Sequence, residues 1–170
     1  MIIGLAGKAG AGKSTVADAL VMKGFQRDAY AKTMKEAISI IFGIPLDILR
    51  SNAAVKSQID PYWGMSYRQI MQLFGTEACR KTFGGDIWER VLWNRHTYVD
   101  YDLVIDDVRF PNEAEAILDR GGQVWEIVRG KDSKDTHSSE TPLPRELITL
   151  VVGNYRAIED LQKIVFELIK

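Results

Sequence analysis

Short apolar runs alternate with segments of helical periodicity along this chain of 170 residues. The first run, residues 1–6 (MIIGLA), is apolar and bounded by glycine, which predicts a buried strand. Four further runs have the composition of strands, at residues 25–31, 102–107, 123–129 and 147–152. Because helical patterns separate most of these runs, we expect an α/β protein in which helices cover both faces of a five-stranded parallel sheet.

Signals for helix ends support this alternation. The spacing of Val16 and Leu20 after the first strand predicts a helix, and Gly24 predicts its end. The segments SYRQ (66–69) and DIWE (86–89) have the pattern of a capping box, so each predicts the start of a helix. A last apolar stripe, expected to cover the sheet, consists of Ile158, Leu161, Val165 and Leu168.

The segment between the first strand and the first helix, GLAGKAGAGKST (4–15), places several glycines around one lysine. Residues 7–14 satisfy the phosphate-binding pattern of ATP- and GTP-using proteins: Gly, four residues of any type, Gly, Lys, then Ser or Thr. The glycines allow conformations in which consecutive N–H groups surround phosphate oxygens. Lys13 adds a positive charge, Ser14 offers a hydroxyl to Mg²⁺, and the helix N-terminus favours an anion. The nucleotide contacts expected from this loop are Gly7, Ala9, Gly10, Ala11, Gly12, Lys13 and Ser14.

A dinucleotide-binding loop is an alternative interpretation of the same glycines. GAG at residues 10–12 begins that fingerprint, and Asp28 lies near the position of a ribose-binding carboxylate. However, Thr15 stands where the third glycine belongs, and Lys13 and Ser14 have no role in that scheme. We therefore discard the alternative.

The composition is that of one domain of ordinary size, with 46% hydrophobic and 26% charged residues, so we expect a single domain over residues 1–170. A net charge of −1 argues against a surface dominated by nucleic-acid binding. The one cysteine, Cys79, excludes an intramolecular disulfide, and we interpret it as a small packed residue. The lack of a signal peptide and of a membrane-length apolar run favours a cytoplasmic protein without a membrane partner.

A second group of charged residues follows the predicted third strand, in LVIDDVRFPNEAEAI (103–117). In open α/β sheets the ligand lies beyond the carboxyl ends of the strands, so this strand end is expected to face the same crevice as the glycine-rich loop. Asp106 and Asp107 are candidates for holding Mg²⁺ through water or for orienting a substrate group, and Arg109 for gripping a phosphate. The alternative is an ordinary strand end with solvated charges and a helix that starts at Pro111.

Two more segments suit phosphate chemistry. Residues 129–140 (RGKDSKDTHSSE) form a polar stretch where many small kinases carry a mobile lid, and we place the lid at residues 130–146. Its cations, which include Arg129, are expected to close on a transferring phosphoryl group; the alternative is a merely solvated loop. The expected lid cations are Arg129, Lys131 and Lys134.

Residues 44–98 are predicted to be an insertion between the second and third strands that binds a second substrate. Arg68 and Arg80 are candidates for its phosphate, and either Trp88 or Phe74 is a candidate for contact with its base. The alternative for most apolar residues of this segment is simple packing in a helical core.

Four segments, GKAGAGKST, QLFGTEACR…DIW, VIDDVRFPNEAEAI and HSSE, resemble the bacteriophage-type deoxynucleoside monophosphate kinases, and the resemblance runs over nearly the whole chain. Beyond the glycine-rich loop, residues 107–113 are its most specific part. The resemblance implies transfer of the γ-phosphoryl group of ATP to a deoxynucleoside 5′-monophosphate, giving the diphosphate. It also implies the P-loop three-layer α/β/α fold of nucleoside monophosphate kinases, with strand order 2-3-1-4-5, a monophosphate-binding insertion and a lid.

The resemblance assigns roles residue by residue. It places Gly12, Lys13, Ser14 and Thr15 on ATP phosphates and Mg²⁺. The expected catalytic residues are Lys13, Asp107, Arg109 and Arg129, and the expected metal ligands are Ser14, Asp106 and Asp107. The expected contacts of the monophosphate are Lys32, Lys35, Arg68, Gly75, Thr76, Glu77, Arg80, Trp88 and Glu140. His137 and Ser139 fall in the lid region, and Asn154 falls near the adenine, although this chain has Arg156 where the family commonly has glycine.

Other functions remain open at this point. One is a small P-loop kinase for another phosphorylated metabolite, such as phosphomevalonate or dephospho-coenzyme A. Another is a nucleotide-dependent switch or motor, but the guanine-reading Asn-Lys-x-Asp motif of GTPase switches is absent, and residues 119–122 (DRGG) are better interpreted as a helix end. The expected partners are small-molecule nucleotides and, through the aromatic residues Tyr62, Trp63 and Tyr67, a second copy in a homodimer.

Overall fold

The computed structural model describes residues 1–98, 100–129, 142–155 and 157–169. The chain forms two compact units. Unit 1 consists of Met1–Ala29 with Thr97–Lys170, and unit 2 of Tyr30–His96. Within the described ranges, no helix is both long and apolar enough to span a membrane.

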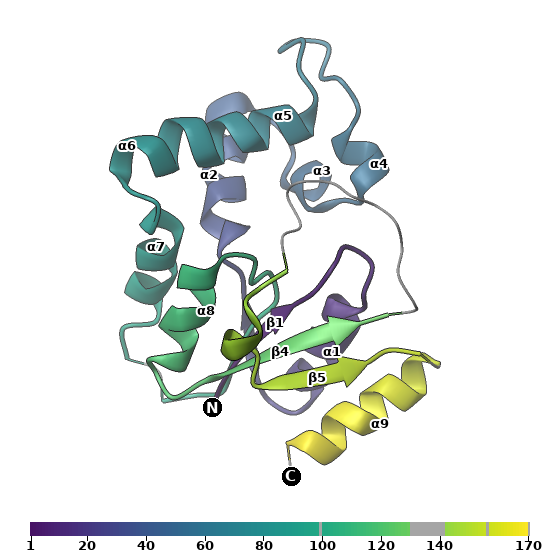
Figure 1. Ribbon diagram of the computed structural model, residues 1–170. Helices are drawn as coiled ribbons and strands as arrows, with labels where there is room; N and C mark the ends of the chain where they lie inside the picture. Colours follow the sequence, from purple (N-terminus) through teal and green to yellow (C-terminus); the bar gives the residue numbers. More distant parts are fainter. Residues whose placement is uncertain (99, 130–141, 156, 170) are drawn as a thin grey trace. The chain divides into compact units, whose positions relative to one another are not determined.

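Unit 1 is built on a parallel sheet that, over the described residues, has five strands in the order β2-β3-β1-β4-β5 (Figure 1). The strands are β1 (Ile2–Ala6), β2 (Gln26–Asp28), β3 (Leu103–Ile105), β4 (Gln123–Val128) and β5 (Leu150–Gly153). The predicted sheet and its order are therefore confirmed. Since β1 lies in the middle of the sheet, the glycine-rich loop that follows it starts from the centre of unit 1.

Helices cover both faces of this sheet (Figure 1). Ile3 and Leu5 of β1 pack in one core with α1 (Lys13–Met22) and α9 (Ile158–Leu168). Side chains alternate along a strand, and Gly4 accordingly faces α8 (Pro111–Leu118) on the other side. A Cβ atom at Gly4 would lie 2.5 Å from Cδ1 of Ile117, so only glycine allows α8 to pack this closely. The predicted three-layer arrangement is confirmed.

Several predicted boundaries shift because an apolar run does not distinguish a strand from the buried start of a helix. The run 25–31 contains a strand of only three residues, and its buried Tyr30 instead precedes α2 (Ala31–Phe42). The run 147–152 begins in a short 3₁₀ turn (Arg145–Leu147), so β5 starts only at Leu150. The predicted helix ends at Gly24 and at residues 119–122 are confirmed, since α1 stops at Met22 and α8 stops at Leu118.

The named elements of unit 2 are all helices, and an isolated antiparallel β-bridge joins Ile59 to Ser66. Besides α2 the unit contains α3 (Leu46–Arg50), α4 (Ala53–Lys56), α5 (Tyr67–Gln72), the π-helix η1 (Leu73–Arg80), α6 (Lys81–Phe83) and α7 (Ile87–Arg95). Figure 1 shows α5, η1 and α6 as one continuous helical rod. The buried centre of one core of this unit consists of Ile38, Ile44, Leu49 and Ile70.

The two capping boxes predicted in this unit have different outcomes. At α5 the prediction is confirmed, because Ser66 Oγ accepts from the Gln69 amide at 3.2 Å and Gln69 Oε1 accepts from the Ser66 amide at 2.9 Å. At α7 the prediction is wrong. Asp86 adopts φ −90° and ψ 2° rather than the extended conformation of a capping residue, and its side chain does not cap the helix.

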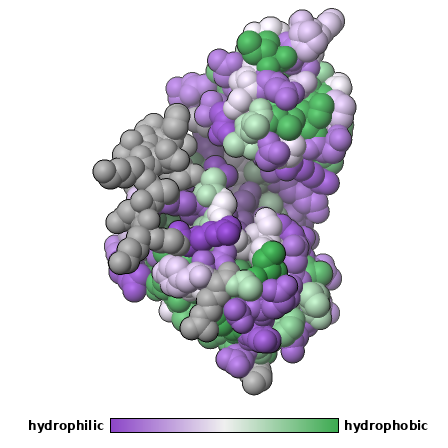
Figure 2. Space-filling model, turned by 90° about the vertical axis from the view of Figure 1, so that its right-hand side faces the viewer, coloured by the Kyte–Doolittle hydropathy of each residue, from purple (hydrophilic) through white to green (hydrophobic). Residues whose placement is uncertain are grey.

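Several exposed apolar side chains lie on unit 2. The upper part of Figure 2 shows small apolar patches separated by polar residues. Tyr62 is 84% exposed, and its ring contacts Trp63 edge-on, with 5.0 Å between ring centroids. The indole of Trp63 donates to the Phe42 carbonyl at 3.0 Å, and Tyr67 is half-buried. The expected homodimer contact through these aromatic residues stays a prediction.

The glycine-rich loop allows a direct test of its backbone geometry. Gly7 has φ +130°, and a Cβ atom there would overlap the backbone carbonyl oxygen of Ile127 in β4. Gly10 also has positive φ, +77°, but a Cβ atom there would meet open space. We expect Gly10→Ala to lower the free energy of unfolding by about 1 kcal/mol and Gly7→Ala by about 3 kcal/mol or more, because only Gly7→Ala adds a steric clash. Urea denaturation of both variants measures the difference, and equal losses would contradict the predicted clash.

Candidate active site

The glycine-rich loop connects β1 to α1 in the order strand, loop, helix that the sequence predicts. Gly7, Gly10 and Gly12 all have φ between 77° and 130°, the left-handed region that other residues rarely adopt. Gly12 is the N-cap of α1, and no side chain caps the helix there. The first N–H groups of α1 and its partial positive charge are therefore directed at the loop, as an anion site requires.

Lys13 lies across this loop. Its ammonium group donates to the carbonyl oxygen of Gly7 at 2.6 Å and to that of Lys8 at 2.9 Å. Arg129, just after β4, approaches the same loop, with one guanidinium nitrogen 3.5 Å from the Gly10 carbonyl oxygen. Two of the predicted catalytic cations thus contact the loop backbone. Ser14 is exposed and Thr15 partly exposed in the first turn of α1.

Asn154, which follows β5, supports the loop from the other side. Its side-chain amide donates to the Ala11 carbonyl at 2.9 Å, and its backbone amide donates to the Val128 carbonyl at 2.7 Å. A Cβ atom at Gly12 would overlap this same side-chain amide. Asn154 therefore packs against the loop, and the adenine contact implied by the family resemblance stays a prediction.

The end of β3 is held between its two neighbouring strands. The Asp106 amide donates to the carbonyl of Asp28, the last residue of β2, and the Val108 amide donates to the Leu5 carbonyl of β1, each at 3.2 Å. Asp107 lies between these two attachments. The backbone thus places Asp107 at the carboxyl edge of the sheet, beside the strand that leads into the glycine-rich loop.

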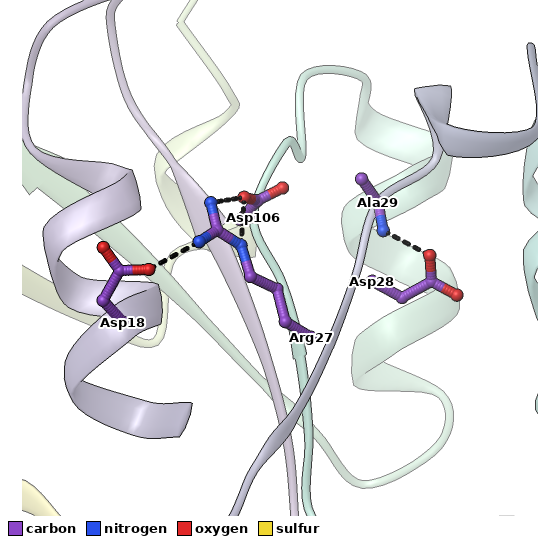
Figure 3. A network of polar contacts seen from close by, with 5 residues as sticks. All are labelled: Asp18, Arg27, Asp28, Ala29 and Asp106. Carbon is purple, nitrogen blue, oxygen red and sulfur yellow. Dashed lines mark hydrogen bonds and ion pairs between the residues drawn. The ribbon is translucent and has the colours of Figure 1, made fainter. Parts of the chain in front are cut away.

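Asp106 itself takes part in a network of charges (Figure 3). Arg27 Nε donates to its carboxylate at 2.7 Å, and a terminal guanidinium nitrogen of Arg27 pairs with the same oxygen. The other terminal nitrogen contacts Asp18 of α1 at 2.6 Å, so Arg27 joins β2, β3 and α1. Asp106 is only 17% exposed and its charge is paired with that of Arg27. The metal roles expected of Asp106 and Asp107 stay predictions.

Asp28 points to the opposite side of β2 from Arg27 (Figure 3). It is 5% exposed, and its carboxylate accepts from the Ala29 amide at 2.8 Å. The sequence offered Asp28 only a ribose-binding role in the discarded dinucleotide scheme. Its carboxylate instead accepts a hydrogen bond within the turn that leads from β2 into the following helix.

Lys13 and Arg109 line one cavity in unit 1, with a volume of about 100 Å³. The glycine-rich loop, Val108, Pro142 and Leu143 form other parts of its wall. The sequence predicts this juxtaposition, because it expects the loop and the end of β3 to face the same crevice. Lys8 lines the same cavity, so its wall carries several cations, and positive charge of this kind suits a phosphate group.

The same cavity contains one carboxylate that the sequence did not predict. Glu126 of β4 lines the cavity, and its carboxylate lies 3.9 Å from the guanidinium of Arg145. The sequence does give one signal for Glu126: it is the single charged residue in the strand-like run of residues 123–128. A carboxylate here opposes a phosphate unless cations balance it, and Lys13, Arg109 and Arg145 supply such cations.

The residues expected to bind the monophosphate lie in unit 2, except Glu140. Thr76 and Glu77 are exposed on the π-helix, and Glu77 forms an ion pair with Lys81. Arg80 donates to the Gly85 carbonyl at 2.6 Å, and Arg68 is exposed at the start of α5. The remaining expected contacts in this unit are Lys32 and Lys35, both partly exposed on α2. Burial raises the pKa of the Cys79 thiol on the same π-helix, in agreement with its interpretation as a packed residue.

Trp88, the expected contact of the base, is buried on α7. It is 7% exposed, and its indole N–H donates to the Gly75 carbonyl at 3.1 Å. Gly75 is also packed closely on its other side, where a Cβ atom would lie 2.5 Å from the sulfur of Met34. The indole of Trp88 is thus attached to the π-helix through Gly75, and its expected contact with a base stays a prediction. π-Helical turns are rare and often occur at functional sites.

Several predicted residues lie outside the part of the chain that the structure describes. These are Lys131, Lys134, His137, Ser139, Glu140 and Arg156. The predicted lid of residues 130–146 is described only from residue 142 onward.

The contact between Trp88 and Gly75 can be tested against a matched residue. Trp93 is also 7% exposed on α7, so Trp93→Phe removes the same atoms while the Trp88–Gly75 hydrogen bond stays in place. We expect Trp88→Phe to cost about 1 kcal/mol more stability than Trp93→Phe, because it also removes a buried hydrogen bond. It should specifically accelerate amide hydrogen exchange in residues 73–80, measured by mass spectrometry. Equal exchange in the two variants would show that Trp88 does not hold the π-helix.

Residues 46–165 match the family model of the deoxynucleotide monophosphate kinases. The chain belongs to this family. Family membership makes it a nucleotide-binding kinase, as the sequence predicts, and confirms the resemblance to the phage-type enzymes.

Named relatives come from viruses. The chain is 31% identical to a putative deoxynucleotide monophosphate kinase of Acanthamoeba polyphaga mimivirus, over 94% of this chain and 91% of that protein. It is 32% identical to the deoxynucleotide monophosphate kinase of Enterobacteria phage T4, over 63% of this chain and 46% of the phage protein. The deoxynucleoside-5′-monophosphate kinase of Escherichia phage T5 is 33% identical, over 58% of this chain and 43% of that protein. The matches thus span less than half the length of these phage relatives but nearly all of the mimivirus protein.

Solved structures share the fold. A dephospho-CoA kinase from Campylobacter jejuni has a TM-score of 0.56 at 13% identity, covering 99% of this chain and 94% of that one. The Thermus thermophilus protein TT1252 has a TM-score of 0.53 at 17% identity, covering 99% and 96%. At these identities the likeness shows the P-loop kinase fold alone.

Proposed function

We propose that this chain transfers the γ-phosphoryl group of ATP to a deoxynucleoside 5′-monophosphate. The observation that carries the proposal is the cavity in which Lys13 of the glycine-rich loop faces Arg109 from the end of β3. Membership of the deoxynucleotide monophosphate kinase family supports the choice of acceptor.

The loop fits the phosphates of ATP. Its three left-handed glycines turn the backbone around the N-terminus of α1, where N–H groups attract anions. Lys13 moves from the loop carbonyls to the phosphates when they bind, because a phosphate offers it a stronger ion pair than the Gly7 and Lys8 carbonyls do. Arg129 approaches the loop at Gly10 and supplies a further cation.

The residues present also fit Mg²⁺. Magnesium sites at nucleotides use one or two protein oxygens together with substrate phosphates and water. Ser14 in the first turn of α1 and Asp107 at the end of β3 supply these oxygens. Among the described residues no group of three or more acidic, histidine or cysteine side chains is placed to hold a metal, which agrees with a metal held mainly by the nucleotide. Bound Mg²⁺ supplies positive charge that neutralises the phosphate oxygens.

The reaction then depends mainly on position and charge. Phosphoryl transfer requires little covalent chemistry from the protein, and the acceptor is already an anion, so no strong base is needed. Lys13 and Arg109 neutralise charge on the transferring group. In unit 2, Arg68 of α5 and Arg80 of the π-helix are proposed to bind the acceptor phosphate, together with Thr76 of the π-helix.

The viral relatives support a setting for this reaction. We propose that the enzyme acts in the cytoplasm of an infected host cell, on small-molecule nucleotides.

The decisive experiment measures ATP consumption against a panel of deoxyribonucleoside and ribonucleoside monophosphates, with dephospho-coenzyme A and phosphomevalonate included. We expect ADP and a deoxynucleoside diphosphate to form only when a deoxynucleoside monophosphate is present. If dephospho-coenzyme A were the only acceptor phosphorylated, the chain would be a different small kinase and the proposal would be wrong. Release of ADP without any acceptor would favour a nucleotide-dependent switch or motor.

Lys13→Ala tests the site itself. Removing the Lys13 ammonium group, which reaches across the loop, should lower turnover by more than tenfold, a loss of more than about 1.4 kcal/mol of transition-state stabilisation. Lys23→Ala is a suitable control, because Lys23 lies just past the far end of α1, over the ring of Phe166. Initial rates at saturating ATP and acceptor measure both variants. A loss smaller than tenfold for Lys13→Ala would refute this account of the site.

A further inference from the structure

Glu113, on the first turn of α8, is one of the two charged residues that are buried among those the structure describes. It is 2% exposed. A buried carboxylate is costly unless hydrogen bonds stabilise it, so its partners indicate why it is there. One oxygen of Glu113 accepts from the Arg109 amide at 2.9 Å and from the Phe110 amide at 3.1 Å.

Backbone hydrogen bonds also join this turn to the helix, here with the helix amides as donors. Phe110 is the extended N-cap of α8, and its carbonyl accepts from the amides of Glu113 at 3.0 Å and Ala114 at 3.2 Å. Pro111 begins the helix, where its lack of an N–H costs no hydrogen bond. Residues 109 and 110 are therefore joined to the first turn of α8 by hydrogen bonds in both directions.

The helix that carries Glu113 is in turn anchored in the core. Ala114 and Ile117 are fully buried, and Ile117 packs against Gly4 of β1. A rigid connection thus runs from the sheet through α8 and the Glu113 carboxylate to the backbone of Arg109. The Arg109 side chain at the end of this connection lines the cavity that it shares with Lys13.

We propose that Glu113 is a positioning residue, which holds Arg109 where its guanidinium group reaches the transferring phosphoryl group. The inference rests on the proposed function for the role of Arg109. In this proposal Glu113 acts only through the backbone of Arg109. The pairing is specific to this carboxylate, because a neutral glutamine replaces a charged acceptor by a weaker one and introduces an NH₂ group facing backbone donors.

The first experiment compares two glutamates on the same helix. Glu115 is exposed on α8, so Glu115→Gln makes the same chemical change as Glu113→Gln without affecting the turn. We expect Glu113→Gln to lower kcat for the deoxynucleoside monophosphate reaction by at least about tenfold with the KM for ATP changed less, and Glu115→Gln to stay within about twofold of the wild type. Equal rates in the two variants would overturn the inference.

A double-mutant cycle shows whether Glu113 acts through Arg109. We expect Arg109→Ala to lower kcat, and Glu113→Gln to cause no further loss when added to Arg109→Ala, because the group it positions is already gone. Losses that multiply would show that Glu113 supports activity by another route and would overturn the inference. If Glu113→Gln does not fold, Glu113→Asp retains the charge but shortens the reach, and it replaces Glu113→Gln in the cycle.

A readout that needs no turnover separates failure of this inference from failure of the proposed function. Glu113→Gln should accelerate amide hydrogen exchange at Arg109 and Phe110 and leave exchange in β4 unchanged, whereas Glu115→Gln should change neither. Unchanged exchange at Arg109 and Phe110 overturns the positioning role even if the enzyme is active. If exchange accelerates as expected but the wild type phosphorylates no deoxynucleoside monophosphate, the proposed function fails and the connection between Glu113 and the Arg109 backbone stands.

Discussion

The hydrogen bond from the Val108 amide to the Leu5 carbonyl attaches the end of β3 to the strand that leads into the glycine-rich loop. Parallel strands end at the same edge of a sheet, so this one attachment brings residues about a hundred positions apart to one cavity. Lys13 comes from the helix after β1 and Arg109 from the turn after β3. The order of the strands therefore determines where the site of this kinase lies, and the side chains determine its chemistry.

Much of this arrangement could be predicted from the sequence. The glycine-rich pattern has a fixed spacing because its backbone must curve around phosphate oxygens, and such a constraint is visible without coordinates. The alternation of apolar runs and helical spacing likewise indicated the sheet and its covering helices. Where local chemistry decides the conformation, as for Ser66 and Gln69 at the start of α5, the prediction was confirmed.

Other features depend on contacts between distant residues and could not be predicted. Asp106 and Asp107 are indistinguishable in sequence, and only the position of Arg27 on the neighbouring strand shows that Asp106 is already paired. Trp88 has an aromatic side chain of the kind that stacks on bases, but its burial against Gly75 depends on how α7 packs. Asp86 precedes its helix as a capping residue should, yet its backbone dihedrals exclude that role. Each of these contacts and conformations depends on tertiary packing, which the local sequence does not specify.

The close approach of the loop to β4 has a consequence for how related sequences can diverge. The atom of Ile127 that excludes a side chain at Gly7 is the main-chain oxygen, which every amino acid carries. Exchanging Ile127 for any other residue therefore leaves the restriction on Gly7 unchanged. The side chains of β4 can therefore vary with the core that they fill. The requirement for glycine in the loop remains, because it comes from the main chain of β4.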